Sequence, residues 1–219
     1  MNNENNLITA ARFLELLKDP EAFSRLQHTP TTVMHDVRIN EKETNITTGK
    51  ASKRIQSIGL DNFTFLEGVT ISHFDALSFH ASGTNFLKGI RFENCSGGWL
   101  SMHGCKMTRF DGYDCNFKVL SLQEVEGPPA TGRQPQHPLI EVSGFSVSEC
   151  VSLEKVKAKE LRLASGHTSA IFKAVAARTN DPLWALQLRM AGIPTYVNTE
   201  IAAEMLREGS FAARMHTAA

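Results

Sequence analysis

The chain has 219 residues, of which 42% are hydrophobic, and its 23 lysine and arginine residues balance 23 aspartate and glutamate residues. This length and apolar content predict one ordinary domain with appendages and exclude a disordered polyelectrolyte. Zero net charge argues against a nucleic-acid-binding surface, which needs clustered basic residues. The 13 phenylalanines stand against only 2 tyrosines and 2 tryptophans, so the aromatic side chains are mostly free of hydrogen-bond donors and suit a dry interior.

Residues 1–57 are predicted to form an N-terminal helical cap and a linker. The apolar side chains of residues 9–18 favour one helix, and the Asp-Pro-Glu sequence at 19–21 supplies the N-cap and first turn of a second. Val33, Val37 and Ile39 predict a strand, and residues 41–54, which are nearly free of apolar side chains, a loop. A basic region followed by an apolar run is missing at the N-terminus, which favours a cytoplasmic protein, or one delivered into a host cell without a classical signal peptide.

Residues 58–166 repeat with a period of five, in lines such as IRFEN, CSGGW, LSMHG and CKMTR. In 19 such lines the first position is apolar in 18, and the third is apolar in 16 and glycine in three. Two apolar residues flanking a polar one predict a three-residue strand with one buried face, and the two residues that follow predict a corner. Strands this short are stable only if the chain coils and stacks successive turns about 4.8 Å apart.

These lines resemble the pentapeptide-repeat family, best at Cys115-Asn116-Phe117-Lys118-Val119, and the resemblance covers residues 58–126 and 140–165. It implies a right-handed, roughly four-sided β-helix of about five coils. First positions are often large here, where the family prefers small residues, so we expect an irregular cross-section. The predicted fold is mainly β: a right-handed β-helix or solenoid of five-residue repeats, with α-helical caps at both ends.

The phenylalanines support this register. Nine of them fall in the repeat region, and each occupies a first or third position (Phe63, Phe65, Phe74, Phe79, Phe86, Phe92, Phe110, Phe117 and Phe145). They are predicted to fill the core of the β-helix.

Residues 167–219 are predicted to form a C-terminal α-helical cap of three helices, in which Asp181 and Pro182 open one helix and Gly192 ends it. These helices would also offer an apolar surface for a homodimer. A DNA-binding helix-turn-helix is the sharper alternative, but three glutamates against one arginine at 200–208 give its reading helix the wrong charge.

The candidates for chemistry are few. Cys95 and Cys115 are predicted to stack one coil apart, with Cys105 opposite, as small buried residues, because histidines or further cysteines at metal-ligand spacing are missing. Residues 167–219 contain no cysteine, which excludes the nucleophile of bacterial ubiquitin-ligase effectors that join a similar β-helix to a catalytic lobe. Asp111 and Asp114 are the one close carboxylate pair on the predicted strands. No enzyme, cofactor or metal site is therefore predicted.

The segment 126–138 interrupts the repeat with about ten surplus residues, and insertions of this kind often form the binding face of a solenoid. The alternative, a surface loop without a role, stays open. The predicted partner-binding residues are those of this loop and two outward aromatic residues: Pro128, Pro129, Arg133, Gln134, Gln136, His137, Trp99 and Tyr113.

We therefore expect a non-enzymatic protein-binding or scaffold protein, as in a bacterial effector or inhibitor or a phage accessory component. The resemblance raises one alternative, a DNA mimic that modulates a DNA topoisomerase, but the coil region has 10 basic against 12 acidic residues and is too balanced for it. A carbohydrate-cleaving β-helix enzyme is the other alternative, and it needs two carboxylates at a fixed separation.

Overall fold

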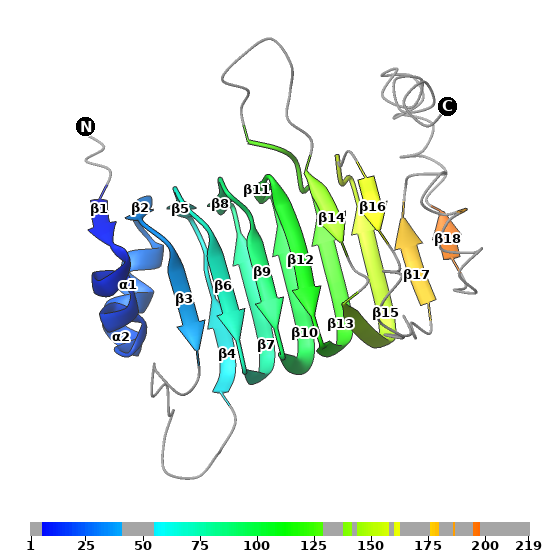
Figure 1. The fold of residues 1–219 in the computed structure, drawn as a ribbon, viewed down its shortest axis with the longest axis horizontal. Helices are drawn as coiled ribbons and strands as arrows, with labels where there is room; N and C mark the ends of the chain where they lie inside the picture. Colours follow the sequence, from blue (N-terminus) through cyan, green and yellow to red (C-terminus); the bar gives the residue numbers. More distant parts are fainter. Residues whose placement is uncertain are drawn as a thin grey trace.

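The computed structural model describes residues 6–40, 55–128, 138–141, 144–157, 160–162, 176–179, 186 and 195–197. The described part of the chain is mainly β, with most of its residues in strands and few in helices. All pairs of neighbouring strands are parallel, and they form three sheets that run along the longest axis of the molecule (Figure 1). Within the described residues no helix is long and apolar enough to cross a membrane.

The three sheets are here named A, B and C. Sheet A contains β1 (Asn6–Thr9), β2 (Thr31–Met34), β5 (Phe63–Phe65), β8 (Asn85–Phe86) and β11 (Lys106–Met107). Sheet B contains β3 (Val37–Asn40), β6 (Val69–Ser72), β9 (Ile90–Glu93), β12 (Arg109–Tyr113), β14 (Leu139–Glu141) and β16 (Glu160–Arg162). Sheet C contains β4 (Ile55–Gly59), β7 (Asp75–Ser82), β10 (Ser96–His103), β13 (Cys115–Gln123), β15 (Phe145–Glu154), β17 (Ala176–Thr179) and β18 (Thr195–Val197).

From β5 to β13 the chain visits sheets A, B and C in strict turn, and each passage through all three is called a circuit below. Asp75 pairs with Ser96, and Ser96 pairs with Asn116, so one circuit consumes four of the five-residue lines. The four expected sides nevertheless occupy three sheets, because two consecutive lines join into one long strand of sheet C. That strand bends: Ala76 and Phe79 are both buried although an odd number of steps separates them, which a straight strand does not allow.

The five-residue register is confirmed by burial. Every first-position side chain of the described lines from Ile58 to Val156 is buried, and so is every third-position side chain other than glycine. All nine phenylalanines of the repeat region are at most 3% exposed. Their rings stack along the axis, as Phe65 does on Phe86 at 5.4 Å between centroids and Phe110 on Phe145 at 5.3 Å.

The corners have a conformation of their own. Eight fifth-position residues have a left-handed backbone with φ between 50° and 63°: Asn62, His73, Gly83, Asn94, Gly104, Asp114, Glu124 and Lys155. Asparagine, aspartate and glycine favour this region, and they occupy five of these eight corners. Directly after the corner, the side chains of Thr84, Cys95, Cys105 and Cys115 donate hydrogen bonds of 3.3–3.5 Å to the backbone carbonyl two residues earlier.

The two predicted N-terminal helices are present as α1 (Ala10–Leu17) and α2 (Pro20–Gln27), at the β1 end of the molecule (Figure 1). The Thr9 hydroxyl and the Asp19 carboxylate accept backbone N–H groups at their N-termini. Phe13 of α1 is fully buried and makes edge-to-face contacts with Phe63 and Phe65. The helices therefore pack on the phenylalanines of β5.

Two strand predictions need correction. Val33, Val37 and Ile39 are buried as expected, but they belong to two strands, β2 and β3, which pair with β5 and β6. The sheets therefore begin well before residue 58, and β1 extends sheet A further, to Asn6.

The predicted C-terminal helical cap contains two strands, β17 and β18, which extend sheet C. The prediction of an entirely helical segment is thus wrong at residues 176–179 and 195–197. The rest of residues 167–219, apart from Leu186, lies outside the described residues, and so do the expected dimer surface and the helix-turn-helix alternative.

Candidate functional site

The structure separates the predicted partner-binding residues. The side chain of Trp99 is 48% exposed on sheet C, whereas that of Tyr113 is 60% exposed on sheet B. Both point outward as predicted, but they lie on different sheets. Pro128 is half-buried, and the remaining loop residues named above, Pro129, Arg133, Gln134, Gln136 and His137, lie outside the described residues.

Trp99 has an apolar neighbour that the sequence analysis did not single out. Leu77 is 56% exposed on β7, the strand that pairs with β10, where Trp99 lies. The register sets Ser78 opposite Trp99, which places Leu77 beside Gly98. A Cβ atom on Gly98 would lie 2.6 Å from the Leu77 carbonyl oxygen, so only glycine fits there. Leu77 and Trp99 together form what we call the apolar patch. The sequence did contain a signal for Leu77: it is an apolar residue at the fourth position of its line, a position that the repeat does not bury.

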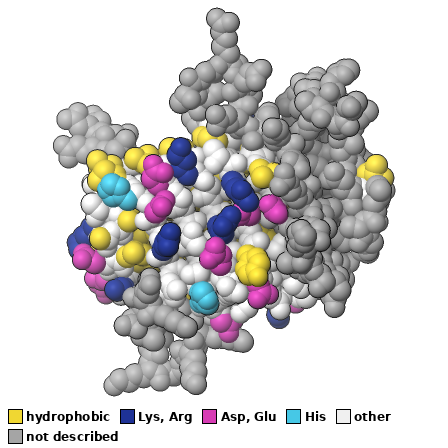
Figure 2. Space-filling model, in the orientation of Figure 1, with side chains coloured by type: hydrophobic (Ala, Val, Ile, Leu, Met, Phe, Trp, Pro, Cys, Tyr) yellow, Lys and Arg dark blue, Asp and Glu magenta, His cyan; other side chains and the backbone are white. Residues whose placement is uncertain are grey.

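The outward face of sheet B carries most of its charge in one row. Pairing between strands sets Arg38 beside Thr70, Thr70 beside Arg91, and Arg91 beside Asp111, all at second positions of their lines. Figure 2 shows basic and acidic side chains gathered over the middle of this face. The row exists because second positions point away from the core on every strand.

Asp111 is the centre of this charged cluster. Its side chain is only 7% exposed. It accepts hydrogen bonds from Arg91 Nε and Nη2, at 3.1 Å and 3.0 Å, and Arg109 Nε lies 2.6 Å from its Oδ2. The hydrogen bonds and charge of Asp111 raise the pKa of Arg91 further above its ordinary value. Asp111 therefore accepts from both arginines, whereas Asp114 is an exposed corner residue.

Two glutamates lie on the outer side of the arginines. Glu93 Oε1 is 3.8 Å from Arg91 Nη1, and Glu141 Oε2 is 3.5 Å from Arg109 Nη2. These five side chains carry two positive and three negative formal charges. Lys88 adds a third positive charge on the side toward Gly89.

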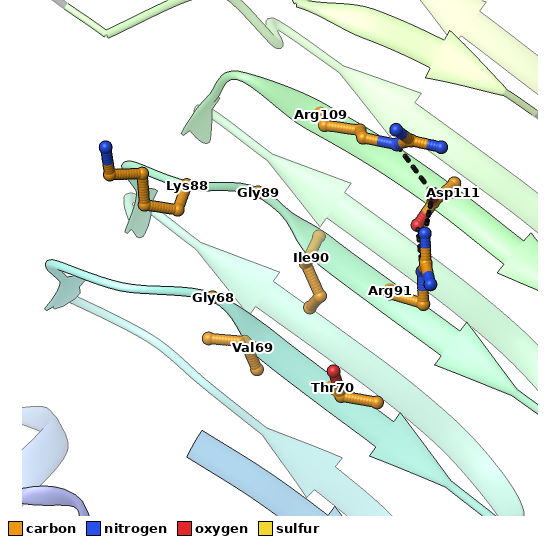
Figure 3. A pocket seen from close by; sticks show the side chains of 9 residues that line it. All are labelled: Gly68, Val69, Thr70, Lys88, Gly89, Ile90, Arg91, Arg109 and Asp111. Carbon is orange, nitrogen blue, oxygen red and sulfur yellow. Dashed lines mark hydrogen bonds and ion pairs between the residues drawn. The ribbon is translucent and has the colours of Figure 1, made fainter. Parts of the chain in front are cut away.

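That side opens into a hollow of about 190 Å³ on sheet B (Figure 3). It is lined by Gly68, Val69, Thr70, Lys88, Gly89, Ile90, Arg91, Arg109 and Asp111. Figure 3 shows Lys88 at one end, the two arginines with Asp111 at the other, and the backbone of β6 and β9 between them. Among the lining residues, Gly68 and Gly89 carry no side chain and Thr70 a short one.

The corner at Gly89 is needed for this shape. Gly89 has φ of 96°, and a Cβ atom there would lie 2.7 Å from the Arg109 carbonyl oxygen. The lines at 63–68 and 84–89 have six residues, whereas the line at 105–109 has five. The pairing offset therefore changes from 21 residues at β8 to 20 at β9, and the surplus residue falls at the Gly89 corner.

Cys95, Cys105 and Cys115 are buried thiols on the inner side of the sheets, as predicted, whereas Cys150 is half-buried. Burial raises the pKa of Cys105 to about 11. Contact with the Cys95 thiol, together with burial, raises the pKa of Cys115. Both thiols are therefore protonated at neutral pH and are poor nucleophiles. Within the described ranges, histidine, cysteine, aspartate and glutamate form no group of three or more that could hold a metal ion.

His80 lies between Ser57 and Asp61, in the order of a nucleophile triad. Its Nδ1 is 3.4 Å from Ser57 Oγ, and its Nε2 is 3.4 Å from Asp61 Oδ2. Because the His80 side chain is 47% exposed and both contacts are long, water competes for each of them. We assign these contacts to the joining of neighbouring circuits.

Comparisons of the chain with protein-family models, with curated proteins and with solved structures find no match.

Proposed function

We propose that the chain is a non-enzymatic protein-binding scaffold, built as a β-solenoid of the pentapeptide-repeat kind and capped at one end by α1 and α2. Three observations support the solenoid: the sheets are parallel, the chain visits them in turn, and each five-residue line buries its first and third positions. Phe13 of α1 and Phe23 of α2 pack against the aromatic ring of Phe63 in β5. This contact supports the role of the two helices as a cap, because their side chains cover the core at this end.

The apolar patch carries the proposal of protein binding. Leu77 and Trp99 are both about half exposed, and they stand on adjacent strands of the same sheet. Single exposed apolar residues are ordinary, but neighbouring ones on a rigid surface are typical of interaction sites, where tryptophan is enriched among the residues that contribute most to affinity. Because paired strands already hold both side chains, their ordering on binding costs little entropy.

Cross-linking in cells tests this proposal. The tagged protein is expressed in its native cells in three forms: the wild type, a Leu77→Ser/Trp99→Ser variant, and a Leu66→Ser control that removes another exposed apolar side chain. Captured proteins are quantified by mass spectrometry after circular dichroism has shown that all three forms are folded. We expect at least one protein to be captured by the wild type and the control and lost from the double variant. Equal capture by all three forms would contradict the proposal.

The loop at 126–138 is the second proposed contact. Glu126 accepts the backbone N–H of Met107 through its carbonyl, and Val125 is buried. A deletion should therefore spare both residues and remove 129–137 alone. If that deletion folds and keeps full capture of the partner, the loop has no role in binding.

A further inference from the structure

We propose that the hollow on sheet B binds an oxyanion, a phosphate or a carboxylate group, between Lys88 and the guanidinium groups of Arg91 and Arg109. The hollow lies on a different sheet from Leu77 and Trp99. The inference therefore goes beyond the proposed function and is tested separately from it.

The charges that line the hollow support this proposal. Three cations, Lys88, Arg91 and Arg109, face one carboxylate, that of Asp111. Glu93 and Glu141 contact the arginines but do not line the hollow. An ion inside it would therefore be closer to an excess of positive charge than to the glutamates.

The donors that remain available point to an oxyanion rather than to a neutral ligand. Asp111 accepts from Nε and Nη2 of Arg91 and binds Nε of Arg109. Within the described residues, the ammonium group of Lys88 has no ion-pair partner, and the Arg91 and Arg109 guanidinium groups are about half exposed. Asp111 thus holds both guanidinium planes in place, and charged donors bind phosphate and carboxylate oxygens through charge-assisted hydrogen bonds. Asp111 is a positioning residue in this arrangement.

The size and the floor of the hollow suit a small anion. Its volume of about 190 Å³ equals that of about six water molecules in the liquid. This is enough for one tetrahedral oxyanion with part of its hydration shell. Thr70 adds a hydroxyl group to the floor at the middle of the charged row.

The exposure of the cations limits the expected affinity. The side chains of Arg91 and Arg109 are 49% and 45% exposed, so water and salt screen their charges. We expect dissociation constants for a free anion on the order of 1 mM at low ionic strength.

Titration with inorganic phosphate, and separately with acetate, tests the proposal. Backbone amide signals are followed by NMR at constant ionic strength, with sodium chloride as the reference titration. We expect saturable shifts at residues 68–70 and 88–91 with phosphate, acetate or both, and the anion that saturates at the lower concentration identifies the preferred oxyanion chemistry.

Three variants separate a built site from general attraction to basic residues. Lys88→Gln removes one donor and should weaken binding about three- to tenfold, the effect of one charge-assisted hydrogen bond at a half-exposed site. Thr70→Leu fills the hollow, leaves every charge in place and should abolish saturation. Lys118→Gln, the matched control, removes an exposed lysine of sheet C that pairs with Glu149 and should change nothing.

Non-saturable shifts with both anions, or shifts equal in the Lys88, Thr70 and Lys118 variants, would overturn the proposal. Because the titration uses the protein alone, its result does not depend on whether a protein partner is captured through Leu77 and Trp99.

Discussion

The corner residues explain why particular side chains occupy the first position of a line. After four of the eight left-handed corners, a threonine hydroxyl or a cysteine thiol donates to the carbonyl two residues earlier. Thr84, the one polar first position in the repeat, shares its single hydroxyl hydrogen between that carbonyl and the carbonyl of Leu60, and it accepts the N–H of Phe63. Its hydroxyl is therefore satisfied, and its complete burial is compatible with an apolar core.

The donor-free core predicts a cost for a single added oxygen atom. Phe92 is 1% exposed and packs edge-on against Phe79 at 4.9 Å. In Phe92→Tyr the new hydroxyl group would lie in an apolar interior, and we expect the free energy of unfolding to fall by about 1–3 kcal/mol. Urea unfolding measures this, with Tyr113→Phe at an exposed site as the control. Equal stability of the wild type and Phe92→Tyr would show that the ring does not face a closed core.

Cys105 predicts a loss of stability at alkaline pH. Its folded pKa is about 11 against an ordinary value of 9.0 because burial disfavours the thiolate. Below pH 9 the thiol is protonated in both states, and above it the unfolded state loses the proton first. Stability must therefore fall as the pH rises from 9 to 11, by about 2 kcal/mol from this residue.

Urea unfolding at pH 8 and pH 10.5 checks this for the wild type and for Cys105→Ala. Other groups titrate in both proteins, so the informative quantity is the difference between their two slopes with pH. We expect the wild type to lose more stability than the variant. Parallel slopes would contradict a buried, protonated Cys105.

At the scale of the element, five-residue lines behave as strands that the corners join at fixed angles. The third-position glycines belong to this packing: a Cβ atom on Gly112 would meet the ring of Phe145 from the next circuit. The small residues of one circuit thus accommodate the large residues of its neighbour. The large side chains at first positions are balanced in this way.

The corner at Gly89 supports a prediction about a turn. Gly89→Ala would introduce a Cβ atom at a left-handed φ and 2.7 Å from the Arg109 carbonyl oxygen. Gly104 also has a positive φ, 59°, but the nearest atom to the Cβ of Gly104→Ala would be 3.9 Å away. We expect the control to cost about 1–2 kcal/mol from backbone strain, and Gly89→Ala to cost at least 1 kcal/mol more. Thermal unfolding compares the two variants. Equal melting temperatures would show that the backbone near Gly89 moves enough to accept the added Cβ atom.

The sequence predicted features that depend on nearby residues better than contacts between residues far apart in the chain. The period of five was sufficient to place the nine phenylalanines and three of the cysteines, and capping residues placed the two N-terminal helices. The period did not extend across residues 41–54, so β2 and β3 were merged into one strand. The offset of 20 residues that stacks Cys95 and Cys115 also sets Arg91 beside Asp111, but a hydrophobic pattern does not show which polar side chains meet. Local hydrophobic pattern was weakest at β17 and β18, where a short strand and a helix look alike.

For the whole molecule, contacts between circuits repeat along the axis. Ion pairs join successive circuits on the outside, as Arg91 does with Asp111 and Lys106 with Glu126. The exposed pairs contribute little individually, usually below about 1 kcal/mol. The stacked rings and backbone ladders inside therefore supply most of the stability, and the open ends of the ladders need cover.

The helices at the β1 end give a prediction about self-association. The Phe13 side chain contacts the aromatic rings of Phe23, Phe63 and Phe65. In Phe13→Asp a charge would enter this apolar cluster, α1 would detach, and strand edges and rings would be exposed to other molecules. We expect oligomers in size-exclusion chromatography with light scattering, together with a lower melting temperature. Leu7→Asp, at a 59% exposed position of β1, is the control and should leave the elution unchanged. A folded variant that elutes like the wild type would contradict a capping role.

The parallel pairing of sheet B has a consequence for whatever meets its outer face. Arg38, Thr70, Arg91 and Asp111 stand on consecutive strands at one register position, so their backbones repeat every 4.8 Å or so, which is the strand spacing. The hydrogen-bonded ladder sets this interval, and side-chain identity does not. Substitutions along the row would therefore change the chemistry at one step while the distance to the next step stays constant, and new recognition patterns could arise on this surface without any change of fold.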